Sequence, residues 1–130
     1  MSTPAPPSPG PALPVEPRAT VTVEHRDTTT VLAVAGELDH ATTPRLVDAV
    51  NLALAGQPAV LILDLSGVVF MTSAGLSALA GAHHGCGDQI QLRIVVTDRI
   101  RLILHRTGLA EVFTLYPSRT HALHSNGSPG

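Results

Sequence analysis

The sequence contains no tryptophan and no lysine, and its 130 residues include one cysteine, two phenylalanines and one tyrosine. With so few aromatic side chains, a core drawn from the 44% apolar residues must consist mainly of Val, Leu, Ile and Ala. The single Cys86 excludes an internal disulfide. No stretch approaches the roughly 18 apolar residues of a membrane helix, and the N-terminus lacks a secretion signal. We therefore expect a cytoplasmic protein without a membrane partner.

Basic charge is also sparse, since eight arginines and ten acidic residues give a formal net charge of −2. The arginines form no cluster along the sequence. A basic patch is the usual footprint of a nucleic-acid-binding domain, so this balance excludes nucleic acid from the predicted partners.

The two ends of the chain differ in composition from its centre. Residues 1–17 hold seven prolines and almost no large apolar side chains, too little hydrophobic surface to offset the entropy of ordering. We therefore predict a disordered Pro-rich tail over 1–18 and a second disordered tail over 125–130. A single domain over 19–124 remains, which is a normal length for one hydrophobic core.

Five segments of this domain are predicted strands. TVTVEH (20–25) and TTVLAVAG (29–36) are β-branched runs separated by the turn-prone Arg26 and Asp27, which favours an antiparallel pair. Later strands are predicted over 59–65, 90–96 and 111–116. The run AVLILDL (59–65) is continuously apolar, as expected of a strand covered on both faces.

Four helices are predicted between and after these strands. The first has Thr43 as N-cap and ends at Gly56, and the second starts near Ser73 and stops at Gly85. Asp98 caps the third, Gly108 ends it in the manner of a Schellman motif, and a short helix covers 118–124. The residues predicted to face the core are Leu46, Val47, Val50 and Leu54 in the first helix, Leu76, Leu79 and Ala80 in the second, and Ile100, Ile103 and Leu104 in the third.

This order of elements predicts an α/β domain with a mixed sheet of four to five strands, the first antiparallel and the later ones parallel, with helices packed on it. Right-handed crossovers then place the carboxyl ends of three strands on one rim. That rim contains GELD (36–39), DLSGVVFMTS (64–73) and TD (97–98). Open α/β sheets meet ligands and partners at such ends, so we expect the functional site here.

Thr72 and Ser73 place two hydroxyl groups where an apolar run gives way to a helix. Their simplest role is structural, because Ser and Thr are preferred helix caps. A helix N-terminus also offers unpaired N–H groups and partial positive charge, so a phosphate on Ser73 is accommodated there. In an interface shaped for a neutral hydroxyl the same phosphate is costly, because its charge loses water.

The segments GELD, with the Thr-Pro helix start after it, and LILDLSGVVFMTSAGLSALAGAH (61–83) resemble the STAS domain family. Within that family, the sequence is similar to the single-domain anti-sigma factor antagonists of bacteria over roughly residues 20–117. The resemblance implies that the protein binds a kinase-type anti-sigma factor, a histidine-kinase-like ATPase, and so releases a sigma factor. Phosphorylation of Ser73 by that kinase then ends the binding, and a phosphatase is a further candidate partner.

The same resemblance implies a set of residues that contact the anti-sigma factor. They are Asp39, Ser66, Phe70, Met71, Thr72, Ala74, Gly75 and Leu76. From the residues themselves, core packing is the favoured role of Phe70, and Gly75 either leaves the helix start open or permits close packing on a strand. Asp39 and Asp64 either bond loop amides or meet basic groups of the partner, and the structural role is favoured for Asp64 because it is placed at a strand end.

Many members of the family carry Asp directly before the serine, where this chain has Thr72. Two alternatives therefore stay open: phosphorylation at Thr72, and a STAS scaffold or nucleotide-binding module in a larger signalling assembly that is never phosphorylated. Enzymatic activity is not predicted, because the sequence has no GxSxG, P-loop or GxGxxG motif. His83, His84 and Cys86 are ligand-type residues, but adjacent histidines point to different sides of a helix, so we predict neither a metal nor a cofactor.

Overall fold

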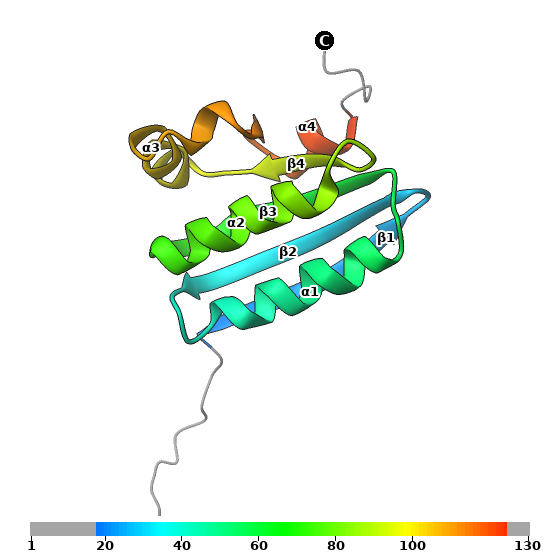
Figure 1. Cartoon of the computed structure of the whole chain (residues 1–130). Helices are drawn as coiled ribbons and strands as arrows, with labels where there is room; N and C mark the ends of the chain where they lie inside the picture. Colours follow the sequence, from blue (N-terminus) through cyan, green and yellow to red (C-terminus); the bar gives the residue numbers. More distant parts are fainter. Residues whose placement is uncertain (1–17, 125–130) are drawn as a thin grey trace, which may run out of the picture.

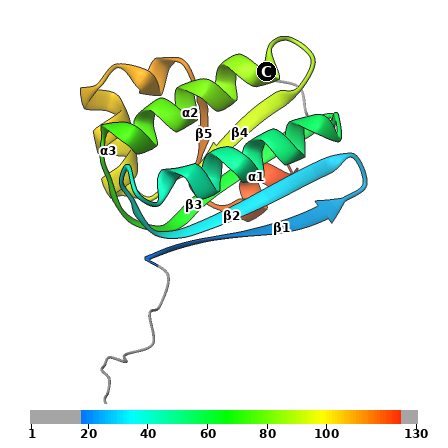
Figure 2. The same cartoon turned by 60° about the horizontal axis from the view of Figure 1, so that its bottom comes forward.

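A computed structural model describes residues 18–124, and the tails predicted for 1–18 and 125–130 lie outside this range except for Arg18. One five-stranded sheet runs in the order β1-β2-β3-β4-β5 (Figure 1 labels the first four strands and Figure 2 all five). β1 (Ala19–Arg26) pairs antiparallel with β2 (Thr29–Leu38), and β3 (Val60–Met71), β4 (Gln91–Val95) and β5 (Thr114–Tyr116) continue in parallel. The predicted mixed α/β sheet is therefore confirmed.

Two long helices cover one face of this sheet, and a short helix lies on the other. α1 (Thr43–Ala55) and α2 (Ser73–Cys86) lie side by side, with α1 against β1 and β2 and α2 against β3 and β4 (Figure 2). α3 (Asp98–Arg106) and a single 3-10 turn, η1 (Leu109–Glu111), connect β4 to β5. α4 (Arg119–His124) contacts β3, β4 and β5 on the opposite face.

The core has a large and a small part, separated by the sheet. The large part packs aliphatic residues of α1, α2 and α3, such as Leu46, Leu79 and Ile100, on alternate residues of the strands. The small part lies under α4, where Ala122 meets Val31, Ile62 and Val95. Apart from Met71, Cys86 and Phe113, the buried apolar side chains are aliphatic, as the shortage of aromatic residues predicts.

Two helices begin one residue away from the predicted position. Thr42, not Thr43, precedes α1, which places Pro44 in the second helical position. Thr97, not Asp98, caps α3, since its hydroxyl oxygen accepts from the N–H of Ile100 at 3.3 Å. Each site has two adjacent residues of types that are preferred at N-caps, so the sequence alone leaves the start uncertain by one residue. Gly108 does end α3 in the left-handed region, with φ of 82°.

The bounds of two parallel strands, β3 and β5, differ from the predictions. β3 continues six residues beyond Leu65 because its second half pairs with β2 up to Leu38 and Met71. β5 begins at Thr114, since Leu109–Glu111 forms the 3-10 turn. Two inward predictions are wrong as well: Val47 is 39% exposed and Ala80 is exposed. The smaller Ala53 and Ala82 are buried instead, which lets α1 and α2 approach the sheet closely.

Candidate functional site

The carboxyl ends of the parallel strands form one rim, as predicted. The N–H of Thr72, after β3, donates to the carbonyl of Leu38, the last residue of β2, at 2.9 Å. Arg99 in the first turn of α3 reaches the carbonyl of Val69 at 3.4 Å. The ends of β2 and β3 and the start of α3 therefore meet around the start of α2.

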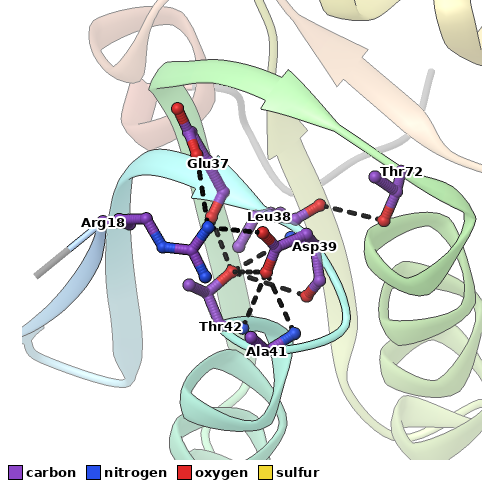
Figure 3. A network of polar contacts seen from close by, with 7 residues as sticks. All are labelled: Arg18, Glu37, Leu38, Asp39, Ala41, Thr42 and Thr72. Atoms are coloured by element: carbon purple, nitrogen blue, oxygen red, sulfur yellow. Dashed lines mark hydrogen bonds and ion pairs between the residues drawn. The ribbon is translucent and has the colours of Figure 1, made fainter.

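Thr72 is the N-cap of α2, and its hydroxyl both donates and accepts a hydrogen bond. The hydroxyl donates to the carbonyl of Leu38 at 3.2 Å and accepts from the N–H of Ala74 at 3.3 Å (Figure 3 shows the first of these bonds). The carbonyl of Thr72 accepts from Leu76 at 3.2 Å. This residue thus ties the end of β2 to the start of α2, which is a structural role.

Ser73 differs from its neighbour in both exposure and bonding. It is the first residue of α2 and is exposed to solvent. Within residues 18–124 its hydroxyl has no hydrogen-bond partner. The N–H groups of Ala74 and Leu76 donate to Thr72, whereas those of Ser73 and Gly75 do not. A group attached to the Ser73 oxygen meets solvent and the positive end of α2.

The three residues after Ser73 are less accessible than Ser73 itself. Ala74 and Leu76 are partly buried, and Gly75 is buried against β2 and β3. A Cβ atom at Gly75 would lie 2.6 Å from Cγ of Met71 and 3.1 Å from Cβ of Leu38. Close packing is therefore the role that the structure shows for Gly75, and Met71, with 7% exposure, belongs to the same contact.

A bulge at the end of β3 exposes two apolar side chains beside Ser73. Gly36 pairs with Val68 but Glu37 pairs with Phe70, so Val69 has no partner residue on β2. Such a bulge breaks the strict alternation of side chains. Val69 and Phe70 are consequently 56% and 50% exposed, while Val68 and Met71 are buried. The core position predicted for Phe70 is wrong for this reason.

Asp39 organises the loop between β2 and α1. Its carboxylate accepts from the N–H groups of Ala41 at 2.9 Å and Thr42 at 3.0 Å, and it lies 3.1 Å from the guanidinium of Arg18 (Figure 3). The Thr42 N–H is the main cause that lowers the pKa of Asp39 below its usual value. These contacts favour the loop-bonding role among the two left open for Asp39.

Asp64 and Ser66 lie on the face of the sheet that carries α4. Asp64 accepts from the Ser66 hydroxyl at 2.7 Å and from Nε of Arg119, in α4, at 2.8 Å. Burial raises the pKa of Asp64, but the bonds from Ser66 and Arg119 outweigh it, so the pKa is lowered. Asp64 is in the middle of β3 and not at a strand end, and the structure does not bring Ser66 and Ser73 together.

Three residues of the rim were missed by the sequence analysis: Arg18, Val69 and Arg99. Arg18 and Arg99 place guanidinium groups on either side of the end of β2 and β3. Two adjacent valines before Phe70 were a usable signal, because strict alternation in a strand cannot bury all three.

The histidines and the cysteine at the end of α2 lie away from the rim. The His83 ring packs edge-on against Phe113 at 5.8 Å, and Cys86 is buried, which raises its pKa. Residues 18–124 hold no group of three His, Cys, Asp or Glu side chains arranged for a metal ion. In the same range, every helix is too short or too polar to cross a membrane.

Comparison with known proteins places this geometry in a family. The STAS domain matches residues 20–122. The anti-sigma-F factor antagonist RsfB of Mycobacterium tuberculosis is 33% identical over 105 residues, which cover 80% of this chain and 86% of RsfB. An anti-sigma-B factor antagonist of Listeria monocytogenes is 30% identical over 99 residues, covering 73% and 86% of the two chains. The crystal structure of an anti-sigma factor antagonist from Mycobacterium paratuberculosis superimposes with a TM-score of 0.78 at 36% identity, covering 85% of this chain and 96% of that one. This chain belongs to the STAS domain family.

Proposed function

We propose that this protein is an anti-sigma factor antagonist that binds a kinase-type anti-sigma factor through the rim around Ser73, and that phosphorylation of Ser73 ends the binding. The names of the relatives from Mycobacterium and Listeria support the first part. In this proposal the protein is a cytoplasmic regulator and not an enzyme.

The observation that carries the choice of residue is the contrast between the two adjacent hydroxyls. The Thr72 hydroxyl is bonded to Leu38 and Ala74, whereas the Ser73 hydroxyl is exposed and has no partner in the described chain. Phosphorylation of Thr72 would remove the hydroxyl proton that it donates to Leu38, but phosphorylation of Ser73 costs no existing hydrogen bond. The proposed acceptor of the phosphate is therefore Ser73.

The surface around Ser73 has the composition of a protein interface. Val69 and Phe70 expose apolar area next to the start of α2, and Arg99 supplies a charged donor at its edge. Aromatic residues and arginine are enriched in such interfaces and often dominate their affinity. We propose Phe70 as the apolar anchor and the partly buried Ala74 and Leu76 as the flanking contacts.

The switch follows from electrostatics. In the free protein, the phosphate keeps its water and gains from the positive end of α2, so the fold tolerates it. In the complex, roughly −1.5 to −2 charges are pressed against a surface that fits a neutral hydroxyl. A penalty of about 4 kcal/mol weakens binding about a thousandfold, and unpaired buried charges reach that size.

The test compares charged variants in binding to a purified histidine-kinase-like anti-sigma factor of the same organism. Ser73→Asp is expected to weaken binding by about a hundredfold or more, while Ser73→Ala binds as wild type. Gln57→Glu adds one charge at the far end of α1 and serves as the matched control. Equal affinities of Ser73→Asp and Gln57→Glu would contradict the switch.

Phosphopeptide mapping after incubation with that kinase and ATP distinguishes the two hydroxyls. We expect the phosphate on Ser73, with none in Ser73→Ala. Phosphate on Thr72 would contradict the choice of Ser73 and identify Thr72 as the phosphorylated residue. A complete lack of phosphate transfer, together with a stable complex or nucleotide binding, would favour the scaffold module over the switch.

A further inference from the structure

The outer edge of β1 carries exposed apolar side chains far from the rim. β1 is the edge strand of the sheet, as Figure 2 shows, and pairs with β2 alone in the described chain. Val23 of β1 is 53% exposed and Leu52 of α1 is 77% exposed. Both line a hollow of about 340 Å³ between the strand and the helix. Ala49 and Ala53 form the floor of this hollow with the buried Leu32.

The backbone of β1 points half of its hydrogen-bonding groups outward. The carbonyl of Arg18 accepts from the N–H of Glu37 at 2.8 Å, which fixes the phase of the antiparallel ladder. The turn at Asp27 and Thr28 joins Arg26 to Thr29, which pair with each other, and Arg26 is again an even-numbered residue like Arg18. Residues with even numbers therefore bond β2. Ala19, Val21, Val23 and His25 direct their N–H and C=O groups away from the sheet.

We propose that a second copy of this chain docks on this edge, with the two β1 strands antiparallel about Val23, so that the sheets of both copies become continuous. Exposed edge strands are ready templates for strand addition. A strand that pairs antiparallel with itself generates a two-fold axis, which is the commonest symmetry of protein dimers.

The side chains of β1 are compatible with this register. Across the two-fold axis, Val23 meets Val23, Thr22 meets Glu24, and Thr20 meets Arg26 of the second copy. No two like charges stand directly opposite each other, an arrangement that would be destabilising. A register centred on Glu24 would place two carboxylates face to face, so the charges favour Val23 over Glu24 as the centre.

Burial of exposed apolar side chains would stabilise this contact. Val23 is on the sheet face that carries α1, so the two hollows adjoin across the axis. Val23 and Leu52 of both copies then leave water together, and the outward N–H and C=O groups gain partners. Ser73 follows β3, which is separated from β1 by β2, so the dimer leaves the start of α2 free in both copies.

The first test measures the mass of the full chain by sedimentation equilibrium from micromolar to millimolar concentration. We expect a monomer–dimer equilibrium, with Val23→Lys and Leu52→Lys each weakening the dimer by about tenfold or more. Val112→Lys changes a 45% exposed apolar residue outside β1 and α1 and is expected to leave the equilibrium unchanged. A monomer at every concentration, or a dimer insensitive to Val23→Lys, overturns the proposal.

The second test examines the register in a Cys86→Ala background, which removes the buried thiol. Val23→Cys is expected to form a disulfide-linked dimer on mild oxidation, because directly paired residues have Cα atoms about 5.5 Å apart. Thr22→Cys is the matched control, with its two copies on the diagonal, about 7–8 Å apart and beyond disulfide reach. Preferential cross-linking of Thr22→Cys, or of neither variant, contradicts the pairing about Val23.

Hydrogen exchange supplies a third readout that does not depend on substitutions. The amides of Val21, Val23 and His25 should gain protection as the protein concentration rises, whereas Thr22 and Glu24 stay protected throughout. Protection of the first group at all concentrations would show that another segment of the same chain covers the edge, and would overturn the proposal.

Discussion

Thr72 is joined to Leu38 twice: its N–H and its hydroxyl both donate to the Leu38 carbonyl, at 2.9 Å and 3.2 Å. The same hydroxyl oxygen caps α2 through Ala74. Thr72 therefore connects the end of β2 to the start of α2, whereas Ser73 is exposed to solvent.

Removing the Thr72 hydroxyl should destabilise the domain. We expect Thr72→Ala to lower the free energy of unfolding by about 1–2 kcal/mol, because it removes the cap and the bond to Leu38. Thr72→Ser and Ser73→Ala are expected to stay within about 0.5 kcal/mol of wild type. Urea denaturation measures all three, and equal stabilities of Thr72→Ala and Ser73→Ala would refute the division of roles.

Two glycines of α2 should respond oppositely to alanine. Gly81→Ala is expected to stabilise the domain by up to about 1 kcal/mol, because nothing lies within 4 Å of its added Cβ. Gly75→Ala gains the same propensity but forces Met71 and Leu38 apart, at a cost of about 1–3 kcal/mol. We predict a net loss of stability for Gly75→Ala in thermal unfolding. A gain equal to that of Gly81→Ala would contradict the packing assigned to Gly75.

Asp64 should contribute to the loss of folding stability at acidic pH. Its folded pKa is lowered from the usual value of 3.8, so its ionised form stabilises the fold above that pH, and this stability is lost as the pH falls through the folded pKa. We expect Asp64→Asn to be less stable than wild type at neutral pH and to lose less stability on acidification. Urea titrations across this range test it, with Asp48→Asn, an exposed carboxylate of α1, as control. Parallel pH profiles of Asp64→Asn and wild type would argue against the role given to Arg119 and Ser66.

Phe70 should matter for binding and little for folding. Because its side chain is half exposed, Phe70→Ala is expected to cost less than about 1 kcal/mol of stability, against about 3–5 for a buried phenylalanine. Affinity for the anti-sigma factor is expected to fall about tenfold or more. Calorimetry on Phe70→Ala and on Val112→Ala, a control at an exposed valine outside the rim, separates the two effects. A large loss of stability with unchanged affinity would reverse this assignment.

Patterns local in the sequence predicted most of the fold. The β-branched runs 20–25 and 29–36 and the glycines after α1 and α3 are local signals, so these elements lie within a few residues of their predicted positions. The bulge at Val69 depends on how β3 pairs with β2, which no local pattern contains. The bond between Arg119 and Asp64 joins residues 55 positions apart, and it could be found only from the fold.

The candidate site also combines features that local sequence patterns predict with features that depend on the fold. The position of Ser73 at a helix start followed from the change of pattern after Met71, and the structure has it there. The separate roles of Thr72 and Ser73 depend on the Leu38 carbonyl, which reaches Thr72 from another strand. Sequence reasoning therefore identified the pair of hydroxyls but left their division open.

The central claim is that a phosphate on Ser73 abolishes binding without disturbing the fold. The most direct measurement is calorimetric titration of the anti-sigma factor with protein phosphorylated at Ser73 and with unmodified protein, each checked by thermal unfolding. We predict an affinity at least about a hundredfold weaker for the phosphorylated form, with an unfolding temperature equal to or above that of the unmodified form. Equal affinities, or a phosphorylated form that loses binding only because it unfolds, would contradict the account.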